Sequence, residues 1–373
     1  MIPLCRPFIG KNECEAVAEV LRSGWLAHGS KVEEFERRFA EYLGVKEAVS
    51  LNSCTSALFL SLVASEIKGE VLIPSFTFVA TANAVVTAGC TPVFVDIDYD
   101  TLNIDPEKIE KKVSSRTRAI MPVHFGGQSC EMTAILKIAK KHQLTVIEDS
   151  AETVGGTYRG KKTGVFGIGC FSFFPTKNMT TGEGGMVTTN SKKLAGKIRA
   201  LAGHGISSTA LTREKTSHPW YRSASYPGYN FRMSNILAAL GVEQLKRIDQ
   251  LNHKRRENAA YLNEGLKTIE EIDLPVEKEK CTHVYQMYTI KVKGIDRNSF
   301  VIKLRERGVG ASVHFDPPVH LQEFYRGRYD SSALDVTEKV ARSIVSLPMF
   351  PQMKKSQLKE VVKKVKEVIR AAK

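Results

Sequence analysis

Cysteine pairs, long apolar runs and a secretory leader pattern are all missing from this chain of 373 residues. Its seven cysteines are scattered, odd in number and without a Cys-x-x-Cys pair, which argues against a disulfide framework and a zinc ribbon. The nine histidines show no metal-type spacing, so no metal is expected. No apolar stretch approaches the roughly 18 residues of a membrane span, and the first residues lack the basic-then-apolar layout of a signal peptide. We therefore expect a cytoplasmic protein that does not associate with a membrane.

Positive charge is in excess, with 54 Lys and Arg against 40 Asp and Glu and a formal net charge of +14. This balance favours an anionic partner: a nucleic acid, an anionic surface or a phosphorylated small molecule. Part of the excess is local, because residues 354–373 hold eight basic residues against two glutamates. Apolar residues recur there at helical spacing, which predicts a surface helix with a solvated basic face. The chain has no compact Arg-rich recognition helix, so nucleic acid is not expected as a partner, and a basic nucleic-acid-binding regulator is kept only as an alternative.

The first half of the chain alternates short apolar runs with helical stretches. The strand candidates are 48–51, 71–74, 91–95, 119–123 and 144–147, and the helix candidates are 55–64, 78–86, 106–113 and 132–142. Strands that alternate with helices in this way predict crossover connections and a mostly parallel sheet that is covered on both faces. Glycines then punctuate short strand-like pieces that end at 170–174.

A different pattern begins near Ser234, with one long helical stretch to about Leu262 and a strand over 284–292. We therefore expect an α/β fold with a large domain over residues 1–245, built on a mixed, mostly parallel sheet. A smaller α+β C-terminal domain is expected over residues 246–373.

Two segments imitate ligand-binding loops. Residues 155–161 have the glycine and lysine spacing of a phosphate-binding loop, but Lys162 stands where Ser or Thr should hold magnesium. A glycine-rich hairpin is the better interpretation. Residues 96–107 imitate a calcium loop, but Thr101 replaces the glycine that this loop needs at its sixth position. An acidic connection between a strand and a helix is expected there.

Three segments carry complementary chemistry. Residues 52–57 (Asn-Ser-Cys-Thr-Ser-Ala) place small hydroxyl residues between a strand and a helix, where backbone N–H groups can bind phosphate. Residues 146–150 form an apolar strand that ends in carboxylates, and ligands bind at the carboxyl ends of parallel strands. In 171–178 a lysine follows an apolar strand, and apolar surroundings make lysine a usable amine nucleophile. A phosphate-binding helix end, a strand-end aspartate and a buried lysine together describe a site for pyridoxal 5'-phosphate (PLP).

At these residues the chain resembles the sugar-nucleotide aminotransferases of the DegT/StrS type, in their perosamine-synthase-like branch. The resemblance covers nearly the whole length, and its most specific part is 171–185. It also includes 23–25, 31–36, 52–58, 74–83, 92–98 and 228–233. It implies the fold type I architecture of PLP-dependent transferases.

The resemblance assigns the cofactor site by position. Lys177 matches the lysine that binds PLP covalently and moves the proton between the amino acid and the cofactor. Asp149 matches the partner of the pyridine nitrogen, and Phe78 matches an aromatic residue that stacks on the ring. The phosphate contacts are matched by Thr55, Ser56, Ser172 and, from the neighbouring subunit, Asn230. A homodimer with shared active sites is therefore implied.

Two further positions depend on the resemblance. Glu152 stands where the family usually has Gln or His near the ring hydroxyl, so its role stays open. His314 matches a residue near the substrate. The implied activity transfers the amine of an amino acid to a 4-keto-6-deoxy sugar nucleotide, and glutamate is the expected donor. An aminotransferase for another sugar position or for a cyclitol is the alternative. A dehydratase of the same family is disfavoured, because that branch carries histidine where this chain has Lys177.

Overall fold

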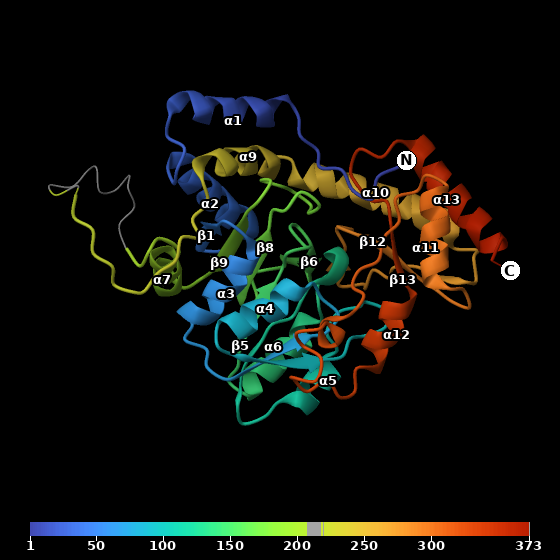
Figure 1. Cartoon of the computed structure of the whole chain (residues 1–373). Coiled ribbons are helices and arrows are strands. Elements are labelled where there is room, and N and C mark those ends of the chain that lie inside the picture. The colour runs from blue at the N-terminus through green and yellow to red at the C-terminus, as the bar shows by residue number, and fades with distance from the viewer. Residues whose placement is uncertain (207–217, 219, 373) are drawn as a thin grey trace.

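The computed structural model describes residues 1–206, 218 and 220–372, and a seven-stranded sheet dominates it (Figure 1). The strands run in the order β1-β9-β8-β5-β4-β2-β3. Their bounds are β1 Glu47–Leu51, β2 Glu70–Pro74, β3 Thr91–Val95, β4 Thr117–Ile120, β5 Thr145–Asp149, β8 Ile168–Ser172 and β9 Gly185–Thr189. All neighbouring strands pair in parallel except at β9, which is antiparallel to both β1 and β8. The expected mixed, mostly parallel sheet is confirmed.

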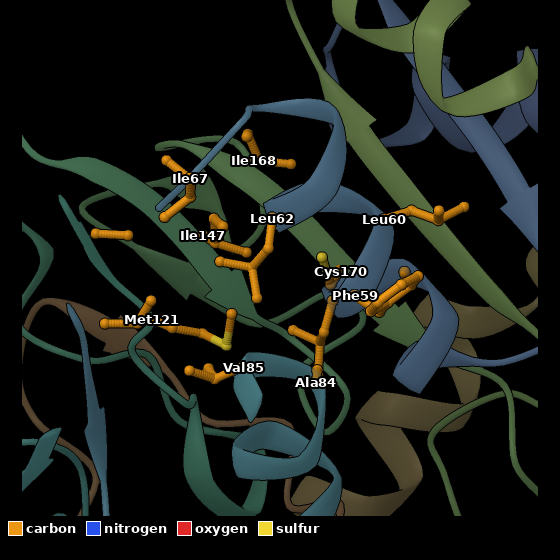
Figure 2. Close-up of a cluster of buried hydrophobic side chains, with 14 of the residues drawn as sticks. Phe59, Leu60, Leu62, Ile67, Ala84, Val85, Met121, Ile147, Ile168 and Cys170 are labelled. Atoms are coloured by element: carbon orange, nitrogen blue, oxygen red, sulfur yellow. The ribbon is translucent and has the colours of Figure 1, made fainter. Parts of the chain in front are cut away.

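Helices cover both faces of this sheet. On one face lie α3 (Cys54–Ala64), α4 (Val79–Thr87) and α7 (Lys192–Ala202), and on the other lie α2 (Ser30–Leu43), α5 (Pro106–Lys112), α6 (Met132–Lys141) and α9 (Asn235–Leu245). Figure 2 shows the first face, where Leu62 of α3 and Val85 of α4 pack towards Ile147 of β5. Neighbouring Val146 belongs to the opposite cluster with α6, as strand alternation requires.

The C-terminal part forms a second, smaller sheet with helices packed against it. Its sheet has the order β10-β12-β13, from Ile272–Asp273, Tyr288–Val292 and Ile344–Leu347. Its helices are α10 (Ile248–Leu266), α11 (Arg297–Glu306), α12 (Asp335–Ser343) and α13 (Lys355–Arg370), with a 3-10 turn η2 at Val319–Leu321. Both chain termini lie at this end of the molecule (Figure 1). The basic surface helix expected near the C-terminus is α13, which buries five of its apolar residues. The domain division at residue 245 stays a prediction.

Two expected elements differ from those observed. The single helix over 234–262 is two helices, α9 and α10, because Arg247 leaves helical geometry and donates to the Phe8 carbonyl at 3.0 Å. The strand over 284–292 is shorter, since β12 begins at Tyr288. Residues 284–287 instead bond to a turn of the large sheet, so they cannot join the ladder.

The remaining described elements are a helix, a turn and a small sheet. They are α1 (Lys11–Ser23), the 3-10 turn η1 (Phe125–Gly127), and a small sheet made of β6 (Thr157–Tyr158), β7 (Lys161–Lys162) and β11 (Cys281–Thr282). The segment that imitates a phosphate-binding loop is thus the expected hairpin, β6 with β7. Among the described residues, no helix combines the length and apolarity that crossing a bilayer would need.

Candidate active site

Lys177 and Glu152 form a pair at the carboxyl edge of the large sheet. Lys177 lies in the loop between β8 and β9 with 16% of its side chain exposed, and its Nζ is 3.2 Å from Glu152 Oε1. The other carboxylate oxygen, Oε2, accepts the backbone N–H of Gly126 at 2.8 Å. The structure therefore brings these two expected site residues together, and it fixes the Glu152 carboxylate from a second side.

Asp149 is the last residue of β5 and is buried beside this pair. Its Oδ2 accepts the Thr81 hydroxyl at 2.8 Å, and its Oδ1 accepts the Ala151 N–H at 3.2 Å. Thr81 is itself 2.9 Å from the Thr77 hydroxyl, one helical turn earlier. Burial raises the pKa of Asp149, because a charge that is removed from water costs free energy. Within the described part of the chain no Lys or Arg forms an ion pair with it, so its charge is available to a bound cation.

Three of the expected phosphate contacts, Thr55, Ser56 and Ser172, lie at the same edge. The helix α3 begins after Ser53, whose side chain accepts the Ser56 N–H at 3.1 Å. Thr55 is exposed in the first turn, where backbone N–H groups lack partners within the helix. The register Ser172↔Gly185↔Leu51 aligns the end of β8 with the strand that leads into α3. This arrangement groups the Ser172 hydroxyl with a helix N-terminus, which suits an anion.

Gly185 shows how closely these segments pack. A Cβ at this position would lie 2.3 Å from the carbonyl carbon of Ser53 and 2.5 Å from the Cys54 nitrogen. Only glycine therefore allows β9 to begin against the turn that precedes α3. The same turn is tightened by the Ser56 hydroxyl, which donates to Asn52 Oδ1 at 2.7 Å.

Two aromatic rings, Phe78 and Phe315, come together from the large-sheet part and the C-terminal part of the chain. Phe78 precedes α4 and is 60% exposed, although its neighbour Phe76 is fully buried. The ring of Phe315, from the C-terminal part, lies 6.3 Å from that of Phe78. His314 is held by Ser346 Oγ, 2.8 Å from its Nδ1. Burial lowers the pKa of His314, while the charges of Glu152 and Lys177 act on it with opposite signs.

Asn230 is the one expected site residue whose side chain the structure leaves apart. It is exposed, and its backbone pairs with Gly203 at the rim of the sheet. The next residue, Phe231, accepts the Asn52 N–H at 2.8 Å. Within the described part of the chain the Asn230 side chain has no hydrogen-bond partner.

Several residues of the site did not follow from the sequence analysis. Thr81 supports Asp149 and Gly126 supports Glu152, although neither was singled out. Thr77 and Thr81 are four residues apart at the start of a helix, a spacing that could have revealed their common face. No local sequence pattern marks the contact of Gly126 with Glu152, because Gly126 donates a backbone N–H from a turn that is 26 residues before Glu152.

Comparison with known proteins decides the family. The model of the DegT/DnrJ/EryC1/StrS aminotransferase family matches residues 7–366. The chain belongs to this family. It is 41% identical to the spore coat polysaccharide biosynthesis protein SpsC of Bacillus subtilis, over 100% of this chain and 98% of that protein. The resemblance to the DegT/StrS-type family is thereby confirmed, as is the aminotransferase class.

Solved structures agree with the family. Helicobacter pylori PseC, an aminotransferase involved in the biosynthesis of pseudoaminic acid, is 31% identical with a TM-score of 0.91, over 99% of both chains. Spr1654 of Streptococcus pneumoniae, in its PLP-form, is 27% identical with a TM-score of 0.93, over 100% of this chain and 99% of that one. These likenesses over whole chains confirm the fold type I architecture.

Proposed function

We propose that this chain is a PLP-dependent aminotransferase that transfers the amine of an amino acid to a 4-keto-6-deoxy sugar nucleotide. The amino acid that we propose as the donor is glutamate. One observation carries the proposal: Lys177, Asp149 and the N-terminus of α3 share one edge of the sheet. The family membership supports the amine transfer, and the involvement of PseC in pseudoaminic acid biosynthesis supports a sugar acceptor.

The residues fit PLP in charge and shape. A buried carboxylate without a cationic partner, Asp149, suits the protonated ring nitrogen, and the start of α3 suits the phosphate. The exposed ring of Phe78 offers an apolar face beside them. PLP supplies, when bound, an aldehyde that accepts amines and a ring that withdraws electrons from the carbon that loses its proton.

The side chains of the chain would divide the remaining work. Asp149 keeps a negative charge at the ring nitrogen, and its hydrogen bond from Thr81 holds that carboxylate in one orientation. Lys177 would offer its own amine to the cofactor aldehyde and would carry the proton at Nζ. Glu152, whose Oε1 is 3.2 Å away, fixes the position of Nζ. His314 interacts electrostatically with Glu152 and Lys177, and it would contact the acceptor.

We further propose a homodimer with shared sites. Asn230 is exposed and has no hydrogen-bond partner for its side chain in the described residues, and the chain before it exposes Trp220 and Tyr221 by 72% and 68%. Large exposed aromatic side chains of this kind are typical of protein interfaces. A second copy would cover them and bring its Asn230 to the phosphate end of the site.

The decisive experiment is an assay of the purified protein with PLP and glutamate against a panel of keto-sugar nucleotides that differ in ring position. Formation of 2-oxoglutarate with a 4-keto-6-deoxy acceptor, and absorbance near 410–430 nm, the rough range of a lysine-bound pyridoxal, are expected. Transfer to another ring position or to a cyclitol would show that the proposed acceptor, a 4-keto-6-deoxy sugar nucleotide, is wrong. Absence of the pyridoxal absorbance would refute the proposed cofactor.

A further inference from the structure

Residues 283–287 connect β11 to β12 and bind the turn that supports Glu152. The Val284 N–H donates to the Gly127 carbonyl at 2.9 Å, and the Met287 N–H donates to the Gly126 carbonyl at 3.2 Å. The N–H of the same Gly126 donates to Glu152 Oε2 at 2.8 Å. One peptide turn therefore links this connecting segment to the Glu152 carboxylate.

The same segment also holds both chain neighbours of Lys177. The side-chain amide of Gln286 donates to the Thr176 carbonyl at 2.9 Å. On the other side, Asn178 Nδ2 donates to the Val284 carbonyl at 3.2 Å and to Asn252 Oδ1 at 2.7 Å. Asn178 makes its two contacts in buried surroundings, whereas the bond from buried Gln286 to exposed Thr176 is partly buried.

A buried arginine anchors the segment in turn. Arg255 of α10 is 1% exposed, and its Nη1 lies 3.3 Å from the Tyr285 carbonyl and 3.2 Å from those of Gln286 and Met349. In the described part of the chain it forms no ion pair with a carboxylate. Its guanidinium binds backbone carbonyls and also interacts with the Cys5 side chain. The bonds to the carbonyls fix the path of residues 285–286.

Close packing leaves the segment little freedom. Gly127 has a φ of +112°, and a Cβ there would lie 2.8 Å from the Tyr285 nitrogen and 2.9 Å from the Gln286 nitrogen. Among the described residues, the Thr176 carbonyl accepts one other hydrogen bond, from the Cys5 thiol at 3.7 Å, and a thiol is a weak donor. Among the side chains of the segment, Gln286 alone donates to the loop of Lys177.

We infer that Gln286 is a positioning residue for Lys177. Its side-chain amide fixes the peptide before Lys177, and Arg255 holds the Gln286 backbone carbonyl. The backbone of the same segment fixes Glu152 through Gly126. The distance between Lys177 Nζ and Glu152 is thus set by one connecting segment of the C-terminal part. The catalytic meaning of this inference rests on the proposed function, whereas the mechanical link does not.

Hydrogen exchange in the protein without cofactor tests the link directly. The Lys177 N–H is protected by the Phe174 carbonyl at 2.9 Å. In Gln286→Met, which keeps the length but removes the donor, we expect exchange at Lys177 to be several-fold faster, about the effect of losing one partly buried hydrogen bond. The matched control is Asn258→Leu on α10, which removes a buried amide that donates to the Phe350 carbonyl at 3.0 Å and should leave exchange at Lys177 unchanged.

Three results would overturn the inference: unchanged exchange at Lys177 in Gln286→Met, equal acceleration in the control, or acceleration spread evenly over the chain. Should Gln286→Met fail to fold, Gln286→Glu serves instead, because an ionised carboxylate cannot donate to the Thr176 carbonyl, and the same result is expected.

A parallel measurement separates this inference from the proposed function. Wild-type protein is incubated with PLP and reduced with borohydride, and the modified residue is located by mass spectrometry. Modification at Lys177 is expected in the wild type, with an at least several-fold lower yield per minute in Gln286→Met. If no lysine were modified in the wild type, the proposed function would fail, while the exchange result would still decide the link.

Discussion

Glu148 and Asp149 are consecutive residues of β5, and their carboxylates have different partners because successive side chains of a strand point to opposite faces. Glu148 is fully buried and accepts three backbone N–H groups of residues 164–167 at 2.7–2.9 Å. His124 Nδ1 accepts the Cys130 N–H at 3.0 Å, so its Nε2 carries the proton that faces Glu148. Glu148 therefore organises a loop, whereas Asp149 faces the candidate site.

Replacing Asp149 by Asn tests this division. The variant keeps the shape and an acceptor for Thr81 but loses the charge that stabilises a protonated ring nitrogen. We expect the half-reaction with glutamate, followed by stopped-flow absorbance, to slow by about two orders of magnitude or more, as for loss of other preorganised electrostatic groups. Glu148→Gln is the control: it should lower the unfolding free energy and leave the spectrum of bound PLP unchanged. A wild-type rate in Asp149→Asn would exclude it as the ring partner.

Replacing Lys177 by Ala should abolish transamination and leave the fold intact. The side chain lines the site rather than the packed core, so no large cavity results. Glu152 keeps its bond from Gly126, which limits the cost of losing the ammonium. Lys291→Ala is the control, since this buried lysine donates to the Tyr99 carbonyl away from the site. Turnover above a few per cent of wild type in Lys177→Ala, with native circular dichroism, would contradict the assignment.

Residues 283–287 show, at the scale of an element, how tertiary bonds displace a strand. The apolar alternation of 284–292 predicts a strand, yet only its second half pairs with β13. In the first half, His283 Nδ1 accepts the Tyr285 N–H at 2.9 Å, and the two rings stack 3.9 Å apart. This conformation depends on a neutral imidazole.

The protonation of His283 gives a prediction about pH. Burial, and the nearby charge of Arg256, lower the pKa of His283 to about 3 from its ordinary 6.5. Between these values the unfolded chain binds the proton and the folded chain does not, so stability falls as the pH drops below about 6.5. At pH 5 the unfolding free energy has fallen by about 2 kcal/mol from this cause, relative to its value above pH 6.5. In urea unfolding, His283→Gln should lose about that much less stability than wild type between pH 7 and 5, and an equal loss would contradict the assignment.

At the scale of the molecule, the proposed shared site would be incomplete in one chain. Isologous dimers are the commonest closed assemblies, and a shared site would make PLP binding stabilise the dimer. Asn230 is the residue that would cross to the partner, since its side chain is exposed and has no hydrogen-bond partner in the described residues.

Mixing two inactive variants tests the shared site. A heterodimer of Lys177→Ala and Asn230→Ala chains would carry both defects in one site and neither in the other. After reversible dissociation and exchange of equal amounts, we expect about a quarter of all sites to regain activity. Each variant exchanged with itself is the control. If Asn230→Ala alone were inactive and the exchanged mixture stayed inactive too, sharing through Asn230 would have to be abandoned.

The sequence by itself determined the large sheet and the edge of the candidate site. Strand and helix periods are local, so β1 to β5 and α3 to α6 begin and end within a few residues of where the patterns place them. The carboxyl ends of parallel strands share an edge where ligands bind, which is why Asp149 could be placed at a site, whereas Ser172 followed from the family resemblance.

Only the tertiary structure decided the contacts that hold the site. The break at Arg247, the shortened β12 and the bonds from Gly126 to Glu152 and from Gln286 to Thr176 join residues far apart in the chain. Such bonds involve backbone groups and ordinary amides, which every segment possesses and no spacing marks. Their partners are chosen by the packing of one layer against another, and that information is spread over the whole sequence.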